Sequence, residues 1–382
     1  MNRIQNGLIR RYRLAQTLLN NIVKFPSRLM EQRESRLRQL EALRLMELNR
    51  KKELVVFFIP GIQHVTGGVL QIFSLHRLTR QTICSEKRET VICWLPGKGC
   101  GWHMHKFDGF NNDVVVFQLE MVLSEVASNC TLLFHVPEYI APYFFDHLGW
   151  ERLENLREKH ALRVNILNQN IERLPDATFF CRLRKVIPDL TCTAGNPIWA
   201  SASERQRLGV PLHILPTWYY PDDAPWQSFE TKSNLIIVSP DANPNRELVL
   251  SAISKALPDL TVRVISGLKY EQYLELERRA KWSLTFGEGF DGYFYGPVLR
   301  GGVSFAVRNG TFDLPGFEGC RTIYPDYESM AQKIAGDIRA LDDKSLYEKY
   351  NSSIRAPITE VFSPDRTSSA LSAFYRGNWT YP

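Results

Sequence analysis

The residue with the clearest chemical potential in this sequence is a carboxylate in a glycine-rich turn. Glu288 lies in the segment Gly287-Glu288-Gly289-Phe290, directly after a short apolar run that reads as a strand, and Pro297 predicts the opening of a helix. Free N–H groups at a helix start, together with the helix dipole, attract anions. We therefore expect this turn to bind an anionic ligand whose hydroxyls donate hydrogen bonds to Glu288. The alternative is a structural turn with an incidental carboxylate.

A histidine and a second glutamate lie at the end of another predicted strand. The apolar residues 131–136 lead into His135-Val136-Pro137-Glu138-Tyr139. Open α/β sheets bind ligands at the carboxyl ends of their strands. His135 and Glu138 are therefore candidates to contact an acceptor or to serve as a general base. A buried, hydrogen-bonded histidine is the alternative interpretation of His135.

The first predicted strand, residues 54–59, also leads into a glycine turn. Residues 60–68 contain His64 and the pair Gly67-Gly68, and a helix is expected to follow. The turn lacks the G-x-G-x-x-G spacing of dinucleotide-binding proteins, and no P-loop lysine follows it. The sequence therefore disfavours a nicotinamide oxidoreductase and predicts a turn that contacts a different ligand.

Two further histidines, His103 and His105, lie in a loop between predicted strands. Cysteine, histidine and aspartate side chains between residues 100 and 108 invite a metal interpretation, but histidines spaced i, i+2 in a loop lack a second anchored pair of ligands. We expect no metal site. Together with His64, these histidines are predicted to face the acceptor, with a merely exposed loop as the alternative.

The length and composition predict a globular protein of more than one domain. The chain has 382 residues, of which 44% are hydrophobic and 23% charged, which is typical of soluble proteins and long for a single core. No apolar run is long enough for a membrane span, and no leader pattern follows Met1. The seven scattered cysteines include no C-x-x-C pair, which favours reduced thiols and a cytoplasmic location.

The positive charge is concentrated in one segment. Residues 1–52 carry 13 Lys and Arg against 4 Glu, a net charge of +9, so the remaining residues carry 6 − 9 = −3. Apolar residues recur at helical spacing on either side of Pro26, which predicts a pair of basic amphipathic helices. Such helices can lie on an anionic membrane surface, pack against a second subunit, or pack against the protein's own body. Binding to nucleic acid is not expected, since no folded basic face is indicated.

The alternation of apolar strands and helical segments predicts parallel sheets. We expect an α/β fold of two Rossmann-like domains facing a central cleft, with an N-terminal helical extension. The predicted units are an extension (1–52), an N-terminal domain (53–225), a C-terminal domain (226–345) and a helical tail that packs back on the N-terminal domain (346–382). The expected strands are residues 54–59, 90–95, 113–118, 131–136, 162–167, 191–195, 234–238, 261–265, 282–286, 303–307 and 320–324.

Over about residues 54 to 375 the sequence resembles the GT-B glycosyltransferases, in particular the large retaining family of bacterial polysaccharide and lipopolysaccharide enzymes. Five short motifs carry the resemblance. They are Gly67-Gly68 for the glycine loop, residues 216–223 for "IPNGVD", residues 239–246 for "GR…KG", Glu288-Gly289-Phe290 for "EGFG", and residues 134–139 for the "VQDYE" of rhamnosyltransferases.

The resemblance implies transfer of a sugar from a nucleotide-sugar donor to a glycan or lipid-linked acceptor in bacterial surface polysaccharide synthesis. It implies retention of configuration without a metal or other cofactor, whereas a base role for His135 or Glu138 would imply inversion, and the sequence leaves this open. The expected donor-binding residues are Gly67, Gly68, Ser239, Arg246, Lys269, Gly289, Phe290 and Pro297. The expected partners are the donor and the acceptor, with the inner membrane and a second copy of the chain as further candidates through residues 1–52.

The sequence departs from the family pattern at the phosphate site. The family's Arg and Lys would fall near Pro240 and Asn245, and its second glutamate at Gly296. Either Arg246, Lys269 or Arg300 substitutes for the missing cations, or the chain is a distant branch, or activity is lost. The alternative functions are a nucleotide-sugar epimerase on the same architecture and a non-catalytic assembly subunit.

Overall fold

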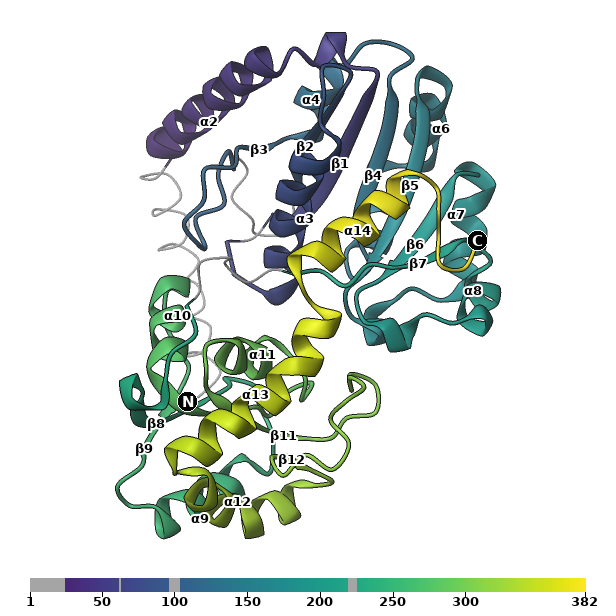
Figure 1. The fold of residues 1–382 in the computed structure, drawn as a ribbon. Coiled ribbons are helices and arrows are strands. Elements are labelled where there is room, and N and C mark those ends of the chain that lie inside the picture. Colours follow the sequence, from purple (N-terminus) through teal and green to yellow (C-terminus); the bar gives the residue numbers. More distant parts are fainter. Residues whose placement is uncertain (1–24, 62, 96–103, 219–224) are drawn as a thin grey trace, which may run out of the picture.

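The protein contains two parallel sheets that form two domains. The structure, a computed structural model, describes residues 25–61, 63–95, 104–218 and 225–382. Within these residues one sheet has seven strands and the other five. Figure 1 shows the sheets in separate lobes, and the chain passes from one lobe to the other after Trp218 and again near residues 361–364. The predicted α/β class with two Rossmann-like domains is confirmed.

The N-terminal domain is built on the seven-stranded sheet in the order β3-β2-β1-β4-β5-β6-β7. Its strands are short apolar runs buried on both faces, as parallel sheets require. The strands are β1 (Glu53–Pro60), β2 (Arg88–Leu95), β3 (Val116–Phe117), β4 (Thr131–Pro137), β5 (Ala161–Asn168), β6 (Leu190–Ala194) and β7 (Leu212–Ile214). The helices are α3 (Gly67–Ile83), α4 (Leu119–Glu125), α5 (Ala141–Leu148), α6 (Trp150–Lys159), α7 (Ala177–Val186) and α8 (Ala202–Leu208), with short 3-10 turns η2 (Ile171–Arg173) and η3 (Pro197–Trp199).

The C-terminal domain is built on the five-stranded sheet in the order β12-β11-β10-β8-β9. The strands are β8 (Ser233–Val238), β9 (Thr261–Val264), β10 (Ala280–Leu284), β11 (Val303–Val307) and β12 (Ile323–Tyr324). The helices are α9 (Arg246–Ala256), α10 (Tyr270–Arg279), α11 (Gly292–Leu299), α12 (Tyr327–Leu341) and α13 (Lys344–Val361), preceded by η4 (Phe229–Thr231).

Two elements differ from the sequence-based expectation. The strand at residues 191–195 was expected to be the last of its sheet, but β7 follows it as the edge strand and pairs with β6. The helix expected to open at Pro297 begins at Gly292, and Pro297 lies inside it. The carboxylate of Asp291 accepts hydrogen bonds from the N–H groups of Tyr293 and Phe294, so an ordinary aspartate N-cap sets the start of this helix.

The described part of the basic extension packs on the N-terminal domain. α2 (Phe25–Met46) continues into η1 (Leu48–Arg50), and both Leu43 and Leu48 lie in the domain's core. The buried Gln39 amide donates to the carbonyl of Met104 and accepts from the N–H of Gln118. This part of the extension therefore belongs to the body of the domain. Of the helices in the described residues, none is both long and apolar enough to cross a bilayer.

The last two helices connect the domains. In Figure 1 they run from the lower lobe, where α13 lies, to the upper lobe, where α14 (Pro364–Tyr375) lies beside α3. Leu371 and Phe374 of α14 are buried in the N-terminal domain's core. Beyond α14, Leu212 and Tyr381 form an isolated antiparallel bridge that pins the end of the chain to the edge strand β7.

Candidate functional site

Glu288 lies at the carboxyl end of β10, in a turn between two glycines. Gly289 has a φ of +84°, and a Cβ there would lie 2.8 Å from the carbonyl oxygen of Val307. A Cβ at Gly287 would lie 2.8 Å from Asp241 Oδ2. Gly289 is required, because its φ is positive and its close neighbour is a backbone carbonyl, whereas the neighbour of Gly287 is the end of a side chain. The turn places the half-buried Glu288 side chain at the edge of the sheet.

A side chain of the other domain contacts this carboxylate. Asn170, which follows β5, donates from Nδ2 to Glu288 Oε1 at 2.6 Å. The amide orientation is fixed, because Asn170 Oδ1 accepts from the N–H of Glu172 at 3.0 Å. Burial raises the pKa of Glu288, and the positive charge of the nearby Arg173 opposes that rise. The carboxyl ends of β5 and β10 therefore meet at Glu288.

Two aspartates accompany Glu288 at this edge. Asp291 is half-buried, and burial together with the negative charges of Asp241 and Glu288 raises its pKa to about 8. Asp241, in the loop after β8, keeps a buried Oδ2 without a hydrogen-bond partner in the described part of the chain. The first turn of α11, which we expected to present free N–H groups to a phosphate, is instead occupied by the Asp291 carboxylate.

Ser239 and Arg246 shape the opposite side of the same turn. The buried Ser239 hydroxyl accepts from the N–H of Phe286 at 3.0 Å, which ties the loop after β8 to the loop after β10. Arg246 donates to the carbonyls of Ser239 and Asp241, and its guanidinium lies 5.4 Å from the centre of the Phe286 ring. Its buried Nε has no partner among the described residues. Arg246 is therefore a cation held against the loop after β8 and the Phe286 ring, two residues before Glu288.

The other two candidate cations lie elsewhere. Lys269 is exposed at the start of α10, where its backbone N–H donates to the side chain of Gln272. Arg300 is 3% exposed and forms a 2.5 Å ion pair with the fully buried Glu277. A buried arginine with a bound carboxylate is not available to a diphosphate, so the expectation that Arg300 replaces a family cation is wrong.

Glu138 supports the loop that carries Asn170. Its carboxylate is 1% exposed and accepts from the N–H of Gln169 at 3.0 Å. Burial raises the pKa of Glu138 to about 7, although backbone N–H groups from Gln169 and Asn170 favour the charged form. Glu138 therefore binds Gln169, the residue before Asn170, and supports this loop from inside the domain. Its carboxylate does not face a ligand.

His135 is not brought to this site. Its ring is fully buried, stacked 4.5 Å from Phe57, and its two nitrogens face the amide of Asn165 and the hydroxyl of Tyr375. Burial lowers the pKa of His135 to about 3, which keeps the ring neutral. Because both nitrogens have protein partners, His135 cannot contact an acceptor in this structure. His135 is a buried, hydrogen-bonded histidine, which was the alternative interpretation of the sequence.

The remaining predicted residues are spread over the two domains. Gly67 and Gly68 begin α3 behind the Thr66 cap, and a Cβ at Gly67 would meet open space. His64 is exposed and His105 half-buried. Phe290 is 4% exposed and packs on other rings of the C-terminal core, and Pro297 is buried inside α11, so neither side chain is available to a donor. His103 lies outside the described residues.

A small cavity lies on the N-terminal side of this region. It measures about 10 Å³, enough for roughly one water molecule. Asn168 and Gln169 line it, and each keeps a buried side-chain oxygen without a protein partner in the described ranges. Its lining is uncharged and consists of Gln71, Leu75, Leu167, Asn168, Gln169, Thr193, Gly195, Leu215 and Thr217. Within the described ranges, no group of three or more His, Cys, Asp or Glu side chains is arranged to hold a metal ion.

Known structures share this architecture. The chain is similar to Anabaena Alr3699/HepE in complex with UDP and glucose (TM-score 0.54, 10% identity, 85% of this chain and 100% of that chain). It is also similar to a putative UDP-N-acetylglucosamine 2-epimerase from Listeria monocytogenes (0.54, 9%, 85% and 96%) and to the trehalose-6-phosphate synthase OtsA (0.52, 10%, 85% and 98%). The chain has the GT-B fold. At these identities the likeness shows the fold alone; no family model and no curated protein matches the sequence.

Within the GT-B architecture, sequence reasoning missed three polar residues of the site. Asn170, Asp241 and Asp291 each follow a strand and lie within a few residues of its end. The rule that ligands bind at the carboxyl ends of parallel strands could have found them. Asp291 also carries the ordinary signal of a helix N-cap, a short acidic residue before an aromatic helical run.

The raised pKa of Glu138 predicts a pH-dependent stability. The carboxyl group has a pKa of about 7 in the folded chain, against an ordinary pKa of 4.5, so its contribution to stability is fully present below pH 4.5 and is lost as the pH rises through 7. Glu138→Gln, which stays neutral, should gain about 3 kcal/mol of unfolding free energy relative to the native chain between pH 4 and pH 8. Denaturant unfolding across this range measures the difference.

The matched control is Glu158→Gln, on the exposed side of α6. Its unfolding free energy should follow that of the native chain at every pH, because an exposed carboxylate contributes little. A Glu138→Gln difference that is constant with pH would contradict the assignment of the raised pKa.

Proposed function

We propose that this protein is a glycosyltransferase that moves a sugar from a nucleotide-sugar donor to a glycan or lipid-linked acceptor. The observation that carries the proposal is Glu288 at the carboxyl end of β10, contacted from the other domain by Asn170. A carboxylate at that point can accept hydrogen bonds from donor-sugar hydroxyls. The similar structures with UDP, with UDP and glucose, and with UDP-glucose add support for a uridine nucleotide as the ligand.

The charges around Glu288 fit the departure of a diphosphate. Leaving-group charge must be stabilised by cations or by oriented N–H groups. Arg246 has an unpaired Nε beside the turn, and the exposed Arg173 lies close enough to lower the pKa of Glu288. In this proposal these two arginines replace the family's cations near Pro240 and Asn245. No cofactor is invoked, and the nucleotide-sugar is a co-substrate.

The acceptor is proposed to approach from the N-terminal domain. The uncharged cavity beside Gln169 offers hydrogen-bonding groups for a sugar hydroxyl, and the exposed His64 and half-buried His105 lie on loops of the same domain. The motif resemblance extends this proposal to hexosyl or deoxyhexosyl transfer in bacterial surface polysaccharide synthesis, with retention of configuration and without a metal, at the cytoplasmic face of the inner membrane.

A nucleotide-sugar epimerase is the second candidate. It is favoured by the similar structures of a putative UDP-N-acetylglucosamine 2-epimerase and of S. aureus MnaA with UDP. The two activities differ in one readout. An epimerase converts a nucleotide-sugar into a second nucleotide-sugar without an acceptor, whereas a transferase releases free nucleotide only when an acceptor takes the sugar. NMR of the purified protein with each donor, with and without acceptor glycan, separates them.

Nucleotide binding is the first test of the proposal. Ligand at 100 times its dissociation constant should add about 2.7 kcal/mol to the apparent stability. We expect a selective thermal shift with one nucleotide class among UDP, GDP, CMP and dTDP and their sugars. No shift with any of them would favour a non-catalytic assembly subunit.

Substitution of Glu288 tests its role. Glu288→Ala should abolish turnover while leaving the unfolding transition within a few degrees of the native one, because a half-buried turn carboxylate adds little stability. The matched control is Glu172→Ala, an exposed carboxylate two residues beyond Asn170, which should keep most of the activity. Initial rates of nucleotide release measure both variants. An unchanged rate in Glu288→Ala would exclude the proposed role.

The N-terminal segment is proposed to contact the anionic membrane surface. Residues 1–24 carry Arg3, Arg10, Arg11, Arg13 and Lys24 and no acidic residue, and each basic group near a bilayer contributes about 1 kcal/mol. Deletion of residues 1–24, which keeps all the described residues of α2, should reduce co-sedimentation with anionic vesicles and leave donor binding unchanged. Equal sedimentation of both forms would favour packing against a second copy, which size-exclusion chromatography with light scattering detects.

A further inference from the structure

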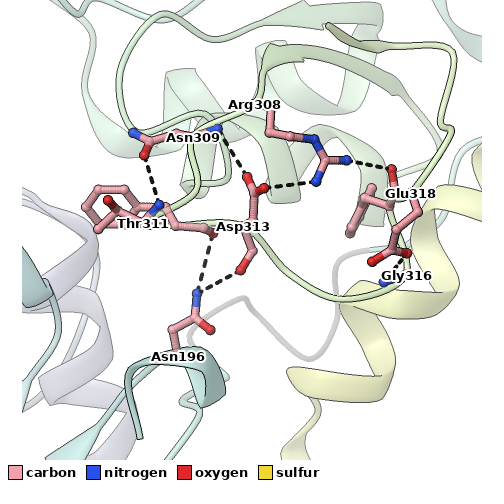
Figure 2. Close-up of polar contacts among 9 residues, drawn as sticks. Asn196, Arg308, Asn309, Thr311, Asp313, Gly316 and Glu318 are labelled. Atoms are coloured by element: carbon pink, nitrogen blue, oxygen red, sulfur yellow. Dashed lines mark hydrogen bonds and ion pairs between the residues drawn. The ribbon is translucent and has the colours of Figure 1, made fainter. Parts of the chain in front are cut away.

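The loop that follows β11, residues 308–318, reaches the N-terminal domain. Figure 2 shows that groups of this loop form hydrogen bonds and an ion pair with one another. Arg308 donates to the Asp313 carboxylate at 3.0 Å and to the carbonyl of Phe317 at 3.2 Å. The side chains of Asn309 and Asp313 accept backbone N–H groups of the loop itself. These bonds fix the shape of the loop and leave the carbonyls at its tip turned outward.

The N-terminal domain supplies the donors that meet those carbonyls. Asn196 donates from Nδ2 to the carbonyls of Phe312 and Asp313, both at 3.4 Å (Figure 2). Trp199 donates from Nε1 to the carbonyl of Thr311 at 2.6 Å, and its ring packs edge-on against Phe312 at 5.7 Å. Asn196 is itself fixed, because its Oδ1 accepts from the N–H of Ile198 and caps η3. Side-chain donors of one domain therefore bind backbone acceptors of the other.

This contact is connected to the candidate site on both sides. In the C-terminal domain the loop begins at Val307, whose carbonyl lies against Gly289 of the Glu288 turn. In the N-terminal domain the N–H of Gly195, the residue before Asn196, donates at 2.8 Å to the carbonyl of Asn168, two residues before Asn170. A shift of Asn196 relative to the loop would therefore move Asn170 relative to Glu288.

We propose that Asn196 and Trp199 are positioning residues. Their hydrogen bonds to the loop 308–318, together called the latch, hold Glu288 against Asn170. The latch consists of protein atoms alone, so the two domains are held together before any nucleotide binds. The expected effect of the latch on donor binding rests on the proposed function. The arrangement of the domains is independent of it.

Two substitutions remove the donors while keeping the other contacts. Trp199→Phe keeps an aromatic ring against Phe312 and loses the N–H. Asn196→Asp keeps the oxygen that caps η3 and places a carboxylate opposite two carbonyls. Loss of one hydrogen bond changes the ratio of closed to open molecules about fivefold, and the repulsive carboxylate changes it further. We therefore expect the double variant to contain a larger fraction of open molecules than the native chain.

Small-angle X-ray scattering of the nucleotide-free full chain measures the opening. The radius of gyration of the double variant should increase, and its dissociation constant for the donor nucleotide should rise at least fivefold. The matched control is Asn234→Asp, whose exposed amide also donates to a backbone carbonyl, that of Asp259, but within one domain. The control should match the native chain in both measurements.

The outcomes separate the latch from the proposed function. An unchanged radius of gyration in a double variant with native circular dichroism overturns the latch. A larger radius in the double variant, together with no nucleotide binding by the native chain, supports the latch and overturns the transferase proposal. A larger radius with unchanged nucleotide affinity overturns the positioning role of Asn196 and Trp199.

Discussion

The parallel direction of the strands is the constraint on which the site depends. In each sheet every strand delivers its following loop to the same edge, so polar residues far apart in sequence gather there without a dedicated motif. The loops after β8 and β10 bring Asp241 and Glu288 together, and the loop after β5 brings Asn170 from the other domain. Most of the strands are apolar and buried, so the polar groups at this edge come mainly from the loops.

The C-terminal domain also contains a fully buried ion pair. Glu277 and Arg300 pair at 2.5 Å, and the ammonium of Lys232 donates to the carbonyls of Arg278 and Ala280 nearby. A Cβ at Gly296 would lie 2.0 Å from Glu277 Oε1. In the resembling family a glutamate is expected at that position, but here a second carboxylate would collide with Glu277. The departure at Gly296 therefore follows from a buried ion pair, which costs several kcal/mol when one partner is left alone.

Local signals in the sequence were sufficient to predict most strands of the two sheets, except β7, and the position of Glu288 after a strand. Apolar runs identify parallel strands, and a carboxylate beside two glycines marks a constrained turn. The errors at His135, Pro297 and Arg300 have a different origin. Each depends on a distant or competing partner: Tyr375 for His135, the Asp291 cap for the helix containing Pro297, and Glu277 for Arg300. Periodicity reports that a residue is buried or at a boundary, but it does not identify the polar group that pairs with it.

The two chain crossings limit how the domains can move. Thr367, at the start of α14, accepts from the N–H of Trp218 at 2.9 Å and donates to the carbonyl of Pro216 at 2.9 Å, so the second crossing is bonded to the first. Ser74 of α3 also donates to the carbonyl of Trp218. Both crossings are thus bonded to the N-terminal domain at one place. Gln169 and Gly195 line the same small cavity as Leu215 and Thr217, so the loops that carry Asn170 and Asn196 lie beside that place. The N–H of Asn111 donates to Glu271 at 2.8 Å, and the Phe110 ring contacts Tyr270, so α10 forms a further contact between the domains. The hydrogen bonds of Asn170, Asn196 and Trp199 therefore add to these contacts in fixing the arrangement of the two domains.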